Sequence, residues 1–120
     1  MRVARIELPA DPASAATARA YINAALANSP RRNDAEQVVT ELIAETLSQG
    51  AHGEMVLTVE HDDTRCRITL DSTERPALRG ESDERTLVIA DAVADGIGHR
   101  YTAATGESIM WAEFTWTVLQ

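Results

Sequence analysis

Two glutamates in one predicted helix are the residues whose type and spacing are best suited to chemistry. Glu41 and Glu45 lie four residues apart in the stretch 33–50, so their carboxylates sit side by side on successive helical turns. Carboxylates serve as general bases and as magnesium ligands. The pair therefore marks the place in the chain where chemistry would occur.

The helix that positions these carboxylates has the clearest pattern in the sequence. Asn33 is a good N-cap, Glu36 can close a capping box with it, and Gly50 is a natural C-terminal stop. Apolar or small residues recur at the spacing of one buried helical face. These residues are Ala35, Val38, Val39, Leu42, Ile43 and Thr46.

Length and charge limit the possible functions. At 120 residues the chain is expected to form a single domain, 1–120, and 44% apolar residues suffice for a core. The net charge of -8 argues against binding to nucleic acid and to anionic membranes, because both require a basic surface. An acidic surface would suit a basic protein partner.

Other signals point to the cytoplasm and exclude several kinds of site. No signal-peptide pattern and no apolar run long enough to span a membrane is present. Cys66 is the single cysteine and is expected to be a small core residue. The histidines lack zinc-ligand spacing, Asp62 and Asp63 lack the spacing of a calcium loop, and no nucleophile-elbow motif occurs.

Alternation and turn signals predict the remaining elements. Strands are expected at 2–8, 54–60, 65–71, 97–102 and 108–119, and helices at 11–26 and 84–95, with an irregular loop at 72–84. The order β-α-α-β-β-α-β-β predicts an α+β fold. We expect a two-layer α/β sandwich in which about three helices cover one face of a mixed, mostly antiparallel sheet.

Element order and three local motifs resemble the histidine-kinase-like (GHKL, Bergerat) ATPase fold, in particular the small bacterial anti-sigma factors that are also serine kinases. The first motif is the helix 34–50, in which Glu41 matches the family's general base. Glu45 stands where the family has a magnesium-binding Asn. The second motif is 71–76, where Asp71 matches the family's adenine-reading Asp.

The third motif, 84–95, matches the body of the family's lid helix but lacks both of its glycines. These glycines let the backbone approach the phosphates closely. Glu84 adds a negative charge at the helix start, which disfavours a phosphate. The chain also has no lysine; its eleven basic residues are all arginines.

The resemblance therefore implies a regulatory protein-binding domain that has lost catalysis and sequesters a protein, such as a sigma factor or an anti-sigma antagonist. It also allows a homodimer. No cofactor is expected. The alternative is an active serine/threonine kinase that binds Mg-ATP. Glu41 would then be the catalytic base and Glu45 the magnesium ligand, and the nucleotide would contact Asp71, Thr73, Arg85 and Thr86.

Overall fold

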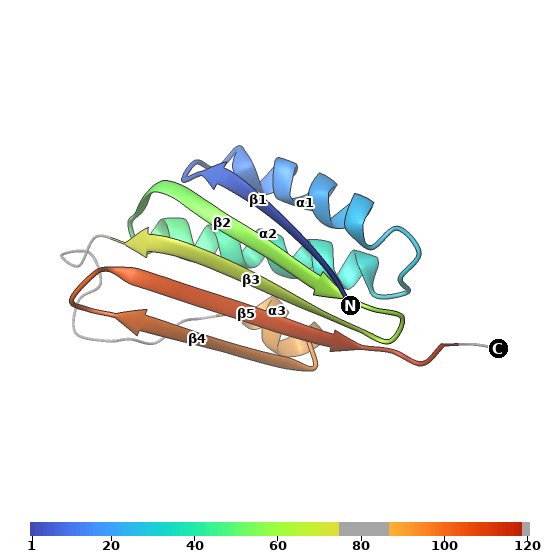
Figure 1. Ribbon diagram of the computed structural model, residues 1–120. Helices are drawn as coiled ribbons and strands as arrows, with labels where there is room; N and C mark the ends of the chain where they lie inside the picture. The colour runs from blue at the N-terminus through green and yellow to red at the C-terminus, as the bar shows by residue number, and fades with distance from the viewer. Residues whose placement is uncertain (75–86, 119–120) are drawn as a thin grey trace.

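The computed structural model describes residues 1–74 and 87–118 and contains the predicted order of elements. Helices and strands alternate as β-α-α-β-β-α-β-β (Figure 1). The elements are β1 (Arg2–Pro9), α1 (Ser14–Ala25), α2 (Arg32–Ser48), β2 (Ala51–His61), β3 (Arg65–Glu74), α3 (Val88–Val93), β4 (Gly96–Thr102) and β5 (Glu107–Thr115).

The strands form one sheet in the order β1-β2-β3-β5-β4, and every neighbouring pair is antiparallel. The expectation of a mixed sheet was therefore wrong for the described strands. The reason lies in the connection from β1 to β2. It contains two helices, which take the chain out and back, so that β2 starts at the end of the sheet where β1 finishes (Figure 1). A single crossover helix would have made the two strands parallel.

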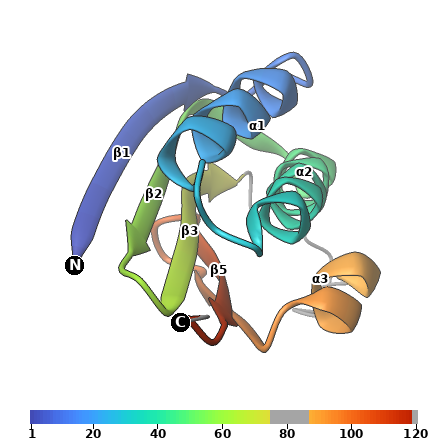
Figure 2. The same cartoon turned by 90° about the vertical axis from the view of Figure 1, so that its right-hand side faces the viewer.

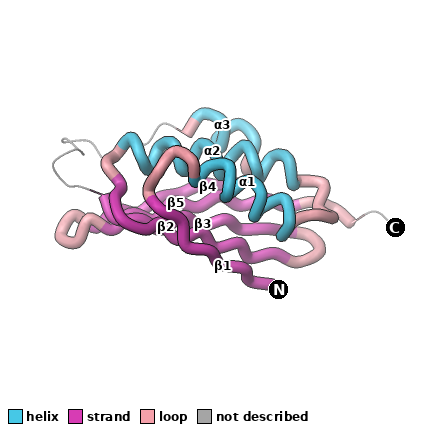
Figure 3. The backbone as a smooth tube through the Cα atoms, turned by 90° about the horizontal axis from the view of Figure 1, so that it is seen from above, coloured by secondary structure: helices cyan, strands magenta, loops and turns pink. Residues whose placement is uncertain are grey.

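Helices α1, α2 and α3 of the described residues lie on one face of the sheet, which confirms the α+β, two-layer arrangement (Figures 2 and 3). The buried face of α2 consists of the six residues predicted for it. The strands contribute alternate residues to the same core, as their patterns predicted. These are chiefly Met55, Leu57 and Val59 of β2, Cys66, Ile68 and Leu70 of β3, and Met110, Ala112 and Phe114 of β5.

The ends of several elements differ from the predictions. Asn33 does not cap α2, because Arg31 occupies the N-cap position and no side chain bonds the helix start there. The predicted helix 84–95 is helical only from Val88 to Val93 among its described residues, and β4 begins at Gly96, one residue before the predicted strand 97–102. Gly50 has the left-handed φ of 85° expected of a helix stop.

The uncovered face of the sheet contains a tight contact between β4 and β5. Gly98 lies directly opposite Trp111, whose indole ring occupies the space that a side chain at position 98 would need. Arg67 lies on the neighbouring strand β3, and its guanidinium is 5.3 Å from the centre of the Trp111 ring. Gly98 is therefore required by the position of the tryptophan.

We predict that Gly98→Ala lowers the free energy of unfolding by about 1–3 kcal/mol, because the new methyl group would displace the indole ring. Gly96→Ala is the matched control, since its methyl group would meet nothing closer than a Glu113 carboxylate oxygen at 3.6 Å. Urea unfolding of both variants measures the difference. Equal stability of the two variants would contradict this account.

Candidate functional site

Glu41 is bound to the start of helix α3. Its Oε2 accepts a hydrogen bond of 2.8 Å from the backbone N–H of Ile89, and its Oε1 accepts one of 2.7 Å from the N–H of Ala90. Both amides lie in the first turn of α3, where backbone N–H groups have no partner within the helix. Glu41 thus serves as an N-terminal cap that comes from a different helix.

Arg31 holds the other end of the same helix. Its Nη2 donates a hydrogen bond of 2.6 Å to the carbonyl oxygen of Val93, the last residue of α3. Its Nη1 contacts the carboxylate of Asp95 at 3.0 Å and the carbonyl oxygen of Thr115 at 2.9 Å. Nε forms an ion pair with Asp34 at 2.9 Å. One side chain of the α1–α2 connection therefore joins α3, β5 and the start of α2.

The two contacts match the dipole of α3. A carboxylate lies at its N-terminus and a guanidinium at its C-terminus, and each charge has the sign that stabilises that end. Since α3 has only six residues, it would not be stable as an isolated helix. Its position over the sheet depends on these contacts and on the buried residues Leu87 and Ala90.

Glu45 takes part in the C-terminal end of α2. Its Oε1 accepts a hydrogen bond of 3.2 Å from the side-chain amide of Gln49, and its backbone carbonyl accepts bonds from the hydroxyl of Ser48 and the N–H of Gln49. No group of three or more His, Cys, Asp and Glu residues in the described part of the chain is arranged to hold a metal ion. Glu45 is therefore not part of such a group there.

Asp71 lies on the face of the sheet opposite the helices. The residues of β3 that face the helices are Cys66, Ile68, Leu70, Ser72 and Glu74, so Asp71 and Thr73 point to the uncovered side. Partial burial raises the pKa of the Asp71 carboxyl, and the nearby charge of Glu107 raises it further. The sheet thus separates Asp71 and Thr73 from Glu41 and Glu45. Arg85 and Thr86 lie outside the described residues.

The polar strand residues that face the helices at this end of the sheet were not predicted, whereas Thr46 of α2 was predicted to be buried. Ser72, Glu74 and Ser108 are buried on the strands, and Thr46 is buried on α2. The hydroxyls of Thr46 and Ser72 have no hydrogen-bond partner among the described residues. The signal was present in the sequence, because positions 72 and 74 continue the buried alternation of residues 66, 68 and 70.

Cys66 is a core residue, as predicted. Burial raises the pKa of its thiol to about 12, with a further contribution from the negative charge of Glu60. The reactive thiolate is therefore scarce at neutral pH.

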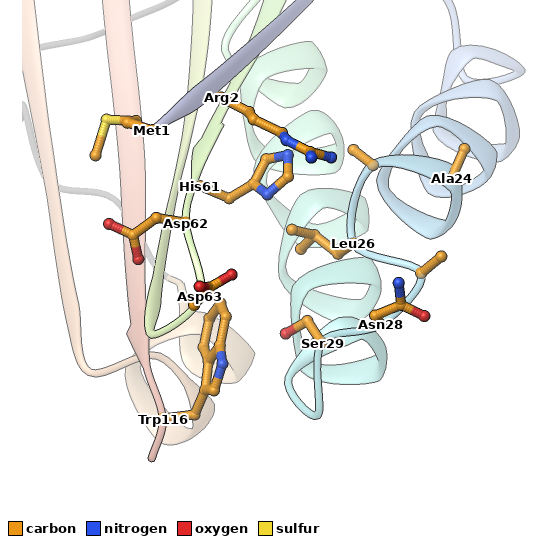
Figure 4. A pocket seen from close by; sticks show the side chains of 12 residues that line it. Met1, Arg2, Ala24, Leu26, Asn28, Ser29, His61, Asp62, Asp63 and Trp116 are labelled. Atoms are coloured by element: carbon orange, nitrogen blue, oxygen red, sulfur yellow. The ribbon is translucent and has the colours of Figure 1, made fainter. Parts of the chain in front are cut away.

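A pocket of about 490 Å³ lies away from the predicted site residues (Figure 4). It is formed by the C-terminal end of α1 with the residues after it, the turn between β2 and β3, and Trp116. Asp63 and Trp116 lie together at one side and Arg2 lies beside His61 at the other (Figure 4). The Asp62 carboxylate is bonded to the backbone N–H groups of Thr64 and Arg65. The pocket thus has groups of both charges and contains neither Glu41 nor Asp71.

Comparisons with protein-family models and with curated proteins find no match for this chain. The family suggested by the sequence motifs therefore stays a prediction. Within the described residues, no helix has the length and apolar character needed to cross a membrane.

We predict that Glu41→Ala lowers the free energy of unfolding by about 1–3 kcal/mol, because two backbone N–H groups of α3 lose their acceptor. Glu45→Ala is the matched control, since it removes the same charge one turn further along α2 but only one side-chain contact. Chemical unfolding measures both. If Glu41→Ala leaves stability unchanged or raises it, the capping role is wrong.

The contacts of Asp95 predict a dependence of stability on pH. The N–H of Thr115, and then the guanidinium of Arg31, hold the pKa of this carboxyl below its ordinary value of 3.8. The folded state thus favours ionised Asp95, so its contribution is present above that value and is lost as the pH falls through the lowered pKa. The stability difference between the wild type and Asp95→Asn should therefore shrink at acid pH. A difference that is constant from pH 7 to about pH 2 would contradict this.

Proposed function

We propose that this chain is a cytoplasmic regulatory domain that works by binding and sequestering a protein partner, and that it does not transfer phosphate. By resemblance, the partner would be a sigma factor or an antagonist of an anti-sigma factor. The observation that carries the proposal is the capping of α3 by Glu41. Glu41, which stands in the position of the family's catalytic base, already accepts hydrogen bonds from two backbone N–H groups.

A kinase of this family would need free backbone N–H groups at the place where Glu41 contacts α3. Phosphate would approach the start of the lid helix and bind the free backbone N–H groups there. In this chain the N–H groups of Ile89 and Ala90 are bonded to the chain's own carboxylate. A nucleotide phosphate would have to displace Glu41 and lie beside its negative charge.

The positions of the other predicted ligands support the same conclusion. A nucleotide between the helices and the sheet could not contact Asp71, which faces the uncovered side. Glu45 adds a carboxylate next to Glu41 where the family has a neutral amide. Two carboxylates near three phosphates would repel them.

The charge of the chain supports a basic protein partner. Its net charge of -8 would attract a positively charged surface, such as one that binds DNA, and would accelerate association. Covering such a surface would prevent the partner from reaching DNA, which is how sequestration would regulate transcription.

One observation favours the alternative, an active domain that binds Mg-ATP. The buried hydroxyls of Thr46 and Ser72 have no partner among the described residues, and polar groups in that state are uncommon in folded proteins. In the alternative, these groups rather than Asp71 would receive a polar ligand at the end of β3.

A thermal melt with and without Mg-ATP separates the two functions. We expect no shift at millimolar Mg-ATP, whereas a ligand at a hundred times its Kd would add about 2.7 kcal/mol, several degrees for a domain of this size. A shift that Ser72→Ala abolishes and Asp71→Ala preserves would contradict the proposal and support the alternative with ligands on the inner face.

Binding to a partner is tested directly with purified sigma factors from the same organism. Immobilised sigma factor should bind this chain without nucleotide, with an association rate that falls as the salt concentration rises. Failure of every sigma factor to bind, with or without Mg-ATP, would reject the sigma-factor assignment.

A further inference from the structure

The pocket beside Trp116 lies at the opposite end of β3 from Asp71 and Thr73. It is lined by the turn that precedes β3, whereas Asp71 and Thr73 are near the last residue of that strand. Its volume of about 490 Å³ is within the range of about 300–1,000 Å³ that is usual for small-molecule sites. None of the described residues predicted to bind ATP or magnesium lines it. The pocket is therefore a separate candidate site.

One wall of the pocket combines a carboxylate with an aromatic ring. Asp63 lies next to the indole ring of Trp116 (Figure 4). Asp62 accepts hydrogen bonds from two backbone N–H groups of the turn and forms an ion pair with Arg65. Asp63 is exposed and forms no ion pair with any described residue. Asp62 thus holds the turn, and the charge of Asp63 is available to a ligand.

The end of helix α1 adds to the attraction for a positive charge at this pocket. The C-terminus of a helix carries a partial negative charge, and α1 has no basic residue in its last turn. Its last two residues and its C-cap, Leu26, line the pocket. Arg32 bonds the carbonyl oxygen of Ala27 beyond the helix at 3.3 Å, but it also pairs with Glu36 at 3.9 Å. The helix end and Asp63 together therefore favour a cation.

The opposite wall can bind an anion. Arg2 and His61 are paired directly across β1 and β2, and their side chains lie side by side at the pocket (Figure 4). Arg2 is exposed and forms no ion pair in the described part of the chain. A guanidinium binds a carboxylate through two parallel hydrogen bonds, and an imidazole N–H can donate another.

The two walls together define the class of ligand. A nucleotide or another polyanion would bring negative charge to Asp63 and to the end of α1, which would repel it. A simple amine would leave the guanidinium of Arg2 without a partner. A ligand with a positive group at one end and a carboxylate at the other would satisfy both walls. Of the possible cations, a planar guanidinium suits the ring of Trp116 better than the ammonium group of lysine.

We propose that this pocket binds arginine with a free carboxylate, either as the free amino acid or as the last residue of a peptide. The guanidinium of the ligand stacks on Trp116 and pairs with Asp63, and its carboxylate pairs with Arg2. The net charge of -8 on the chain also attracts the positive side chain of such a ligand from a distance.

Isothermal titration calorimetry with L-arginine and matched analogues tests the ligand. We expect L-arginine to bind, and the dissociation constant to be raised at least about tenfold for L-citrulline, which has an uncharged group of similar shape. Agmatine, which lacks the carboxylate, should be weakened to the same degree. A tripeptide that ends in arginine, with its carboxylate free or amidated, identifies the source of the ligand. Binding of the free-acid peptide indicates a chain terminus, and binding of the amino acid alone indicates a small molecule.

Substitutions in the two walls test the placement. Asp63→Asn and Arg2→Gln should each raise the dissociation constant for L-arginine at least about tenfold. Both side chains are exposed, so the variants are expected to fold, and circular dichroism verifies this. Asp91→Asn on α3 and Arg100→Gln on β4 are matched controls that make the same changes at exposed positions away from the pocket, and they should retain wild-type affinity.

Three results would overturn the proposal. They are the absence of saturable binding at millimolar L-arginine, equal affinity for L-citrulline, and binding that neither Asp63→Asn nor Arg2→Gln weakens. The titrations contain neither nucleotide nor sigma factor, so their failure would leave the proposed function unaffected.

Discussion

The position of α3 depends on two charged side chains, Glu41 from α2 and Arg31 from the connection before it. One bonds the first backbone amides of α3 and the other bonds its last carbonyl. A helix of six residues cannot offset its own loss of conformational entropy. Because its two ends are held by charges of the signs that its dipole favours, α3 stays over the sheet and completes the helical layer.

This arrangement also explains how a site suited to chemistry can serve a structural purpose. A glutamate beside the start of a helix can activate a substrate or cap the helix, but the same oxygen atoms cannot do both at once. In this chain they are bonded to two amides at 2.7 and 2.8 Å. A lid that must open for a ligand is drawn from the least stable parts of a fold. Capping α3 from outside instead stabilises its observed position over the sheet.

The two faces of the sheet have different properties. The inner face and the helices form the core, and the few polar groups there are buried hydroxyls and Glu74. The outer face carries Asp71, Trp111 and a mixture of charged residues, and its margin is the open edge of β1. The charged side chains of the sheet therefore lie mainly on its outer face, while the inner face maintains the fold.

The sequence by itself determined the order of elements, the buried face of α2 and the alternation of the strands. These features depend on local periodicity, which a single segment contains. The same alternation also predicts that Asp71 lies on the outer face, because its position is out of phase with the buried residues 66, 68 and 70. The adenine-binding role of Asp71 was instead predicted from the motif 71–76, which contains no information about the face of the sheet. Only the tertiary structure revealed that Glu41 caps α3 and that Arg31 joins α3 to β5, because these contacts link residues 48 to 84 positions apart. No local pattern encodes which distant amide a carboxylate will reach. The direction of β2 was decided in the same way, because it depends on how α1 and α2 pack together.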